Sequence, residues 1–109
     1  MAEPIAYSVG MWTAKSGKGN EFEKAWQDMV NYVTQNSMGG IDFYLVQDID
    51  QTNMYLSFGR WENADMFQMW LDSPVFKDYK KQLDALCDDI KIKTMKGVLN
   101  LKGNIARTS

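Results

Sequence analysis

The chain has 109 residues, which is the size of one ordinary domain. Of these residues 45% are hydrophobic and 13% aromatic, so the chain can bury a core and is not of the disordered class. Twelve basic and fourteen acidic residues give a net charge of −2 with no block of like charge, and this excludes the basic footprint that nucleic-acid binding requires.

Two residue types are scarce. The chain has no histidine, which is the usual acid or base at neutral pH, the commonest metal ligand and the usual axial ligand of haem. Ser-His and Cys-His nucleophile pairs and most zinc sites are therefore excluded. The one cysteine, Cys87, has no partner for an intrachain disulfide, and we expect a buried thiol on an apolar helix face.

The start of the chain, MAEPIAYSVG, has neither the basic region nor the apolar stretch of a signal peptide. No run approaches the ~18 apolar residues of a membrane span. We therefore expect a cytoplasmic protein with no membrane partner.

The first half of the chain predicts a strand, a helix and a second strand. Residues 5–13 alternate with the period of two of a strand, and since neither side is strongly polar we expect both sides to be covered. The segment KSGKGN lacks the spacing of a phosphate loop and predicts a turn. Asn20 with Glu23 resembles an N-cap with a capping box, and apolar residues then recur at helical spacing to about Asn36.

The second half predicts a hairpin, two helices and a final strand. Residues 41–48 and 54–61 alternate as strands around the polar turn DIDQTN. Asn63 can cap a short helix, and Ser73-Pro74 can begin another, whose apolar side we expect to extend as far as Cys87. A last strand follows at about residues 90–95. We expect one domain over residues 1–109, with a core from about 5 to 101 and a loose tail from 102 to 109.

The predicted order is β-α-β-β-α-β with the second helix broken, which defines an α+β fold of the ferredoxin-like, split βαβ type. In that fold an antiparallel sheet has helices on one face only. The other face carries too many large apolar residues here to remain in water, so we expect a homodimer in which two such sheets stack.

Trp61 ends a predicted strand, and the segment ENADMFQMWLDSPVFKDYKK follows it. With these residues the chain resembles, from Tyr7 to about Val98, the antibiotic biosynthesis monooxygenase domain of the dimeric α+β barrel superfamily. The family includes cofactor-independent oxygenases of phenolic or quinol-like molecules, quinol oxygenases and haem-degrading oxygenases. The resemblance implies a pocket between the helices and the sheet of each subunit.

The resemblance to two branches is partial. Trp70 has the W-L-x-S-x-x-F context of the haem-degrading branch, but the haem-ligating histidine of that branch falls on Lys80 and its first-strand asparagine on Gly10. A lysine is a poor iron ligand, which leaves Met66, Met69 or Cys87 as the other possible ligands. Trp61 matches the cofactor-free branch, whose neighbouring asparagine and tyrosine are replaced by Ser57 and Phe67.

These comparisons give a set of candidate site residues. The catalytic candidates are Trp61, Tyr55 and Ser57, which share one side of a strand by the period of two. The candidates for substrate binding are Phe67, Trp70, Trp12, Tyr79 and Lys80. For the tryptophans the alternative is a role in core packing, and for Lys80 it is a solvated helix position. Arg60 points to the opposite side of its strand, toward a partner subunit or solvent.

The leading hypothesis is a cofactor-independent monooxygenase, an oxidoreductase that uses O₂ on a small aromatic or quinol-like substrate without metal or nucleotide. An easily oxidised substrate can supply the electrons itself, so no cofactor motif is required. The alternatives are a non-catalytic dimer that binds a small apolar molecule or is purely structural, and a protein that binds haem without degrading it.

Overall fold

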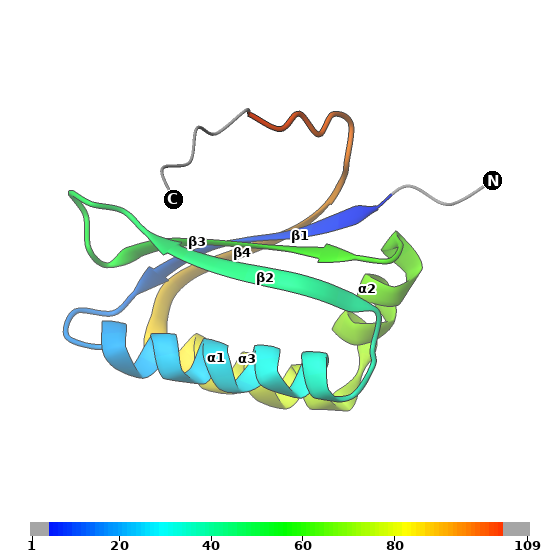
Figure 1. The fold of residues 1–109 in the computed structure, drawn as a ribbon. Helices are drawn as coiled ribbons and strands as arrows, with labels where there is room; N and C mark the ends of the chain where they lie inside the picture. The colour runs from blue at the N-terminus through cyan, green and yellow to red at the C-terminus, as the bar shows by residue number, and fades with distance from the viewer. Residues whose placement is uncertain (1–4, 104–109) are drawn as a thin grey trace, which may run out of the picture.

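The computed structural model describes residues 5–103, which form a four-stranded antiparallel sheet with helices packed on one face (Figure 1). The elements in chain order are β1 (Ala6–Ala14), α1 (Gly19–Gln35), β2 (Gly40–Gln47), β3 (Met54–Trp61), α2 (Ala64–Asp72), α3 (Pro74–Leu86) and β4 (Cys87–Lys96). The strand order across the sheet is β2-β3-β1-β4. The predicted ferredoxin-like order with a broken second helix is confirmed.

Strand β1 lies between β3 and β4, and its register sets which side chains share a face. Gly10 is opposite Ser57 of β3 and also opposite Ile92 of β4. Directly opposed residues point to the same side of an antiparallel sheet, so the three lie in one row across the inner, helix-covered face. Gly10 and Ser57 of this row form part of the floor of the candidate site.

The break between α2 and α3 has the caps that the sequence predicts. The Asn63 side chain accepts a hydrogen bond from the backbone N–H of Met66 at 2.9 Å, which caps α2. The Ser73 hydroxyl accepts one from the backbone N–H of Phe76 at 3.1 Å, and Pro74 occupies the first turn of α3. These caps turn the chain sharply, and α2 therefore covers the end of the sheet beside α1 and α3 (Figure 1).

The predicted start of the first helix is wrong. Helix α1 begins at Gly19, Lys18 occupies the N-cap position, and no side chain caps the helix there. The preceding turn is closed by the Lys18 N–H donating to the Lys15 carbonyl, with Gly17 at a φ of +76°. This glycine turn starts the helix before Asn20 can act as its cap.

Cys87 also differs from its predicted place. It is the first residue of β4, paired with Ala14 of β1, and does not belong to the helix face. The last strand thus begins three residues before the predicted start, because α3 passes into it without a loop. The thiol is buried, as expected.

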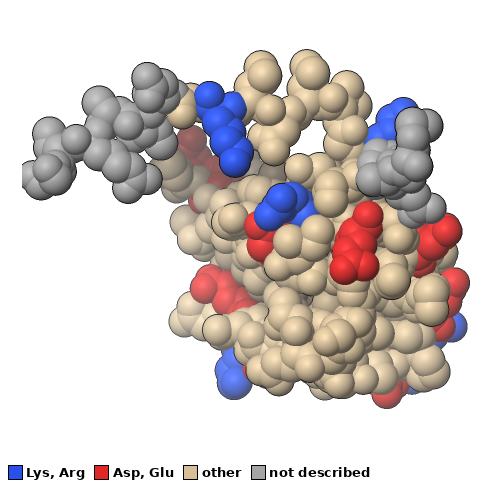
Figure 2. Space-filling model, turned by 45° about the vertical axis from the view of Figure 1, so that its right-hand side comes forward, with Lys and Arg blue, Asp and Glu red and all other residues tan. Residues whose placement is uncertain are grey.

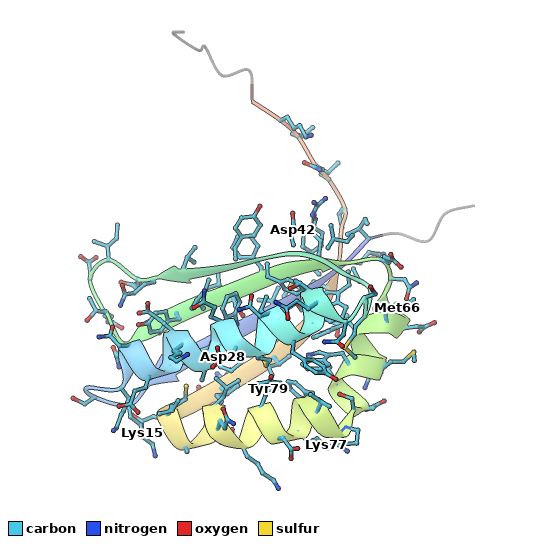
Figure 3. All side chains as sticks on the ribbon, turned by 60° about the horizontal axis from the view of Figure 1, so that its bottom comes forward. Lys15, Asp28, Asp42, Met66, Lys77 and Tyr79 are labelled. Atoms are coloured by element: carbon cyan, nitrogen blue, oxygen red, sulfur yellow. The ribbon has the colours of Figure 1, made fainter. Side chains whose placement is uncertain are left out.

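The core fills the space between the inner face of the sheet and the three helices. Its buried aromatic side chains come from every layer: Trp12, Phe22, Tyr55, Trp61, Phe67, Trp70 and Phe76. Between the two long helices, Tyr79 of α3 points toward α1 (Figure 3), where its ring centroid is 6.1 Å from that of Tyr32. The core is therefore largely aromatic.

The outer face of the sheet carries apolar side chains that no helix covers. Large exposed side chains on this face include Met11, Tyr44, Val46, Met54, Leu56 and Met95. One ion pair crosses the same face, where Arg60 of β3 donates to Asp42 of β2 at 2.7 and 2.8 Å. Figure 3 shows Asp42 on the side of the sheet away from the helices. Arg60 points away from the inner face, as predicted, and its partner is the neighbouring strand.

Candidate functional site

All four tryptophans of the chain line one cavity between the inner face of the sheet and the helices. Its volume is about 50 Å³. The floor is formed by Ser8 and Gly10 of β1 with Ser57 of β3. The helices supply the remaining wall, chiefly through Trp26, Met29, Val33, Phe67, Trp70 and Phe76.

Two indole N–H groups donate to two serine hydroxyls on the floor of this cavity. The Trp12 Nε1–H donates to Ser57 Oγ at 2.8 Å, and the Trp61 Nε1–H donates to Ser8 Oγ at 3.1 Å. Ser57 is 8% exposed, so its hydrogen bond lies away from water. Since a buried indole N–H needs an acceptor, each serine satisfies one tryptophan and fixes its ring.

Gly10 makes room for the first of these pairs. A Cβ atom at this position would lie 2.6 Å from Trp12 Nε1 and 2.7 Å from Ser57 Oγ. Both distances are shorter than a van der Waals contact, so any larger residue would displace the Trp12–Ser57 pair. The close approach explains why glycine stands in the middle of a central strand.

Trp61 is at once a wall of the cavity and a core residue. Its side chain is 1% exposed, with the Phe67 ring centroid at 5.0 Å and the Phe43 ring edge-on at 5.6 Å. Because its N–H already donates to Ser8, what Trp61 presents to the cavity is an aromatic surface. The two interpretations left open by the sequence are thus compatible at this residue.

Trp70 of α2 is held in the same way by neighbouring rings. Tyr32 is stacked on it at a centroid distance of 5.9 Å, and Phe76 meets it edge-on at 5.5 Å. Phe67, from the same helix, lines the cavity beside Trp61. The structure therefore brings together five of the predicted site residues, namely Trp12, Ser57, Trp61, Phe67 and Trp70.

Among the described residues that line the cavity, none has an ionisable side chain. A charged group transferred into such a site loses its hydration and is stabilised only by the hydrogen bonds that the wall offers. Acid–base work by a side chain is thus absent from the wall itself. The wall consists mainly of ring surfaces and other apolar side chains, and the polar side chains on its floor are Ser8 and Ser57.

Tyr55 shares the face of Ser57 and Trp61, as predicted, but it does not line the cavity. Its hydroxyl donates to Glu23 Oε2 at 2.7 Å and accepts from Gln47 Nε2 at 3.2 Å, beside a surface hollow near the start of α1. Burial of the ring and the neighbouring Glu23 carboxylate raise the pKa of Tyr55 from 10.0 to about 12. The phenol is therefore neutral near pH 7 and is bound to its own neighbours.

The other two predicted binding residues lie on α3, outside the cavity. Tyr79 packs near Tyr32, between the two long helices. The Lys80 ammonium forms an ion pair with Asp84 at 2.7 Å, one turn along the helix. This is the solvated helix position that was the alternative for Lys80.

The side chains considered as haem ligands are also outside the cavity. Met69 is 69% exposed on α2, and Met66 packs against Gly39. Cys87 lies at the junction of α3 and β4, where burial raises the pKa of its thiol to about 11. Over residues 5–103 no group of three or more His, Cys, Asp and Glu side chains is placed to hold a metal ion.

Sequence reasoning missed Ser8 as a site residue. The alternation of residues 5–13 places Ser8 and Gly10 on the side of Trp12, so the signal was present. What the sequence could not give was the register with β3, which brings the Trp61 indole over Ser8. A serine and a glycine on the buried side of a central strand are unusual enough to mark such a position.

Fold and cavity together define a class of protein: a ferredoxin-like α+β domain with an apolar, tryptophan-lined site between sheet and helices. A comparison of the sequence with family models identifies the family within this class. The family model described as antibiotic biosynthesis monooxygenase matches residues 5–82, and the chain belongs to that family.

Solved structures show the same fold at low sequence identity. The cofactor-independent oxygenase SnoaB from Streptomyces nogalater has a TM-score of 0.82 and is 21% identical, with 92% of this chain and 99% of that chain covered. A putative antibiotic biosynthesis monooxygenase from Deinococcus radiodurans has a TM-score of 0.78 and is 19% identical, with 90% and 99% covered. Comparison with curated protein sequences gives no match.

Two further properties concern the helices and the distribution of charge on the surface. Within residues 5–103, none of the helices has the length and apolar character needed to cross a membrane. Figure 2 shows one face of the molecule, on which basic and acidic side chains are interspersed and separated by uncharged surface. This agrees with the lack of charge blocks in the sequence.

Proposed function

We propose that this protein is a cofactor-independent monooxygenase that oxidises a small aromatic or quinol-like substrate with O₂ in the tryptophan-lined cavity. The observation that carries the proposal is the cavity wall itself. It consists of four indole rings and further apolar side chains, two hydroxyls and no ionisable group. Such a wall binds a flat, electron-rich molecule and keeps water away from it.

The chemistry suits a wall without a catalytic base or a redox group. An activated ring methylene can react as R₂CH₂ + O₂ → R₂C=O + H₂O, in which one oxygen atom enters the product and the other leaves as water. The substrate supplies all four electrons, so no external reductant is needed. The protein then has to bind, orient and desolvate the substrate, and Trp61, Trp12, Phe67 and Trp70 provide the surfaces for this.

The size of the cavity adds a requirement. About 50 Å³ is a third of the ~150 Å³ cavity that holds a benzene ring. A substrate ring therefore enters only when side chains of the wall move. Met29 of α1 is the most adaptable of them, because a thioether chain has three rotatable bonds, and the half-buried Trp26 lies one turn before it.

We also propose that the protein is a homodimer in which the outer faces of two sheets stack. The support is the apolar outer face, where Met11, Leu56 and Val46 from three neighbouring strands are exposed. A contiguous exposed apolar surface of this kind marks an interaction site. The same patch on two copies related by a two-fold axis is self-complementary, which favours a closed dimer over a filament.

Oxygen uptake tests the proposed activity. The metal-stripped protein is mixed with dihydroxynaphthalenes, anthrones and quinols, and the rate is compared with autoxidation and with that of Trp61→Phe. We expect uptake above autoxidation for at least one class, and a lower rate for the variant at a temperature where its melting curve shows that it is fully folded. A rate equal to autoxidation over the whole panel would contradict the proposal.

The second candidate is a non-catalytic protein that binds a small apolar molecule. It is favoured by one observation, the lack of an ionisable side chain in the cavity wall. It predicts that aromatic ligands bind without consuming oxygen. Binding measured on the same panel, with uptake at the autoxidation rate, would favour it over the oxygenase.

A further inference from the structure

We propose that Ser8 and Ser57 form a pair of hydrogen-bond donors that hold the oxygen atoms of the ligand and select an oxygenated ring over a plain hydrocarbon. The inference rests on the proposed function, since it concerns the same cavity. It assigns a role to Ser8, which no resemblance indicated, and it makes the two hydroxyls together the determinant of specificity for ligands with carbonyl or phenolate oxygens.

The direction of the two indole hydrogen bonds carries the argument. An indole N–H can only donate, whereas a serine hydroxyl has one donor and two acceptor positions. Trp12 and Trp61 therefore use the acceptor side of Ser57 and Ser8, at 2.8 and 3.1 Å. Within residues 5–103 neither serine donates to a protein acceptor, so both O–H groups remain available to a ligand in the cavity.

The sheet register places the two hydroxyls side by side on the floor. Ser8 is opposite Gly59, and Ser57 is opposite Gly10, so the serines are diagonal neighbours on the same face of β1 and β3. Diagonal neighbours lie about 7 to 8 Å apart in an antiparallel pair. A ligand with oxygens on two sides of one ring can therefore contact both hydroxyls at once.

Because the rest of the wall is mostly apolar, these donors should matter for binding a ligand oxygen. A carbonyl or phenolate oxygen brought into an apolar cavity loses its hydrogen bonds to water, and burial then disfavours the charged form. The described wall has no cation to compensate, and the indole N–H groups of Trp12 and Trp61 already donate to the serines. On the floor of the cavity the serine hydroxyls are therefore the side-chain donors left for a ligand oxygen, whereas the indoles of Trp26 and Trp70 belong to the helix side of the wall.

The two tryptophans also hold the donors in place. Ser57 is fixed by Trp12 above Gly10, where no Cβ could be accommodated, and Ser8 is fixed by Trp61. A hydroxyl held by a buried ring keeps its orientation when the ligand enters. Less rotational freedom is then lost on binding than at a free serine.

The test is anaerobic binding of a ligand that is not oxidised and of its matched hydrocarbon. The probes are 2,3-dimethyl-1,4-naphthoquinone and 2,3-dimethylnaphthalene, measured by calorimetry with the wild-type protein, Ser8→Ala, Ser57→Ala and the double variant. Since one hydrogen bond corresponds to about a threefold to tenfold change in affinity, each single variant should bind the quinone that much more weakly. The hydrocarbon should bind all four proteins within about twofold.

The hydrocarbon is the internal control for folding, because a variant with a collapsed cavity loses both ligands. Quinone binding within twofold of wild type in both single variants would overturn the inference and leave the proposed function standing. Equal losses for both ligands would also overturn it, since the serines would then act on the shape of the cavity. If the wild-type protein binds neither probe, the inference is overturned, and oxygen uptake over the substrate panel decides the proposed function separately.

Discussion

The two faces of the sheet are formed by the same strands but differ in how their apolar side chains are covered. On the inner face the helices cover a row of aromatic side chains, and the polar atoms there are paired, as in the Trp12–Ser57 and Trp61–Ser8 hydrogen bonds. On the outer face large apolar side chains remain exposed around the Arg60–Asp42 ion pair. Figure 1 shows the cause, since the helices all lie on one side.

This difference is the basis on which we assign one proposed function to each face. The inner face is covered within one chain and encloses a small cavity, which we propose as the ligand site. The outer face is incomplete within one chain, and an apolar surface in water favours a partner. Substitutions on the inner face should therefore act on stability and ligand binding, and those on the outer face on assembly.

The largest effect is expected for Trp61→Ala on the inner face. This change removes a fully buried ring between Phe43 and Phe67 and leaves the surrounding side chains without contacts. Substitutions of this kind cost about 3–5 kcal/mol of unfolding free energy, which urea denaturation measures. The control is Met69→Ala on α2, where the side chain is 69% exposed and lies away from both faces of the sheet. An equal loss in both variants would contradict the comparison.

The next effect is expected for Leu56→Glu on the outer face. In a stacked dimer two carboxylates would be buried near the contact, and this should weaken association about a hundredfold or more while leaving the fold of each subunit intact. Sedimentation velocity over a concentration series measures the dissociation constant. Met69→Glu, on an exposed helix position, is the matched control. A wild-type protein that sediments as a monomer would refute the proposed dimer.

A smaller effect is expected for Gly10→Ala. The added methyl group would lie within 3 Å of the Trp12 indole and the Ser57 hydroxyl, so the pair must separate or the strand must shift. Overpacking of this kind costs about 1–3 kcal/mol, and the Trp12 fluorescence should change as the indole N–H loses its acceptor. Gly103→Ala, with open space around the Cβ position, should leave both unchanged. Wild-type stability and fluorescence in Gly10→Ala would show that the pair is not tightly held.

The smallest effect is a pH dependence that originates at Tyr55. The pKa of its phenol is raised in the folded chain from 10.0 to about 12, so its contribution to stability is fully present below pH 10 and is lost as the pH rises toward 12. Tyr55→Phe should therefore show a weaker loss of unfolding free energy over this interval. Other tyrosines and lysines titrate there as well, so the difference between the two proteins is the quantity to measure. Parallel curves would place the ionised phenol in water.

The sequence predicted the elements well where local signals agree. The caps at Asn63 and Ser73 and the strand over residues 54–61 follow directly from residue type and alternation. It failed at Asn20, where a glycine turn begins the helix earlier, and at Cys87, where a helix passes directly into a strand. Such junctions depend on the tertiary fold, which a local pattern does not contain.

The candidate site was predicted only in part, for a similar reason. Period two placed Tyr55, Ser57 and Trp61 on one face, and that is where they lie. It could not show that Tyr55 would be bound to Glu23 at one end of the sheet while Ser57 reached the cavity. The role of Ser8 depends on the β1–β3 register and on the rotamer of Trp61. Neither can be derived from the spacing of residues in the sequence.

The central claim is that the inner face holds an aromatic, oxygenated ligand, and a crystal structure with a bound quinone tests it most directly. Crystals grown with 2,3-dimethyl-1,4-naphthoquinone should show the ring among the tryptophans, with Met29 displaced and the two quinone oxygens within hydrogen-bond distance of Ser8 Oγ and Ser57 Oγ. A closed cavity at saturating ligand, or a quinone seated on the outer face of the sheet, would contradict the account.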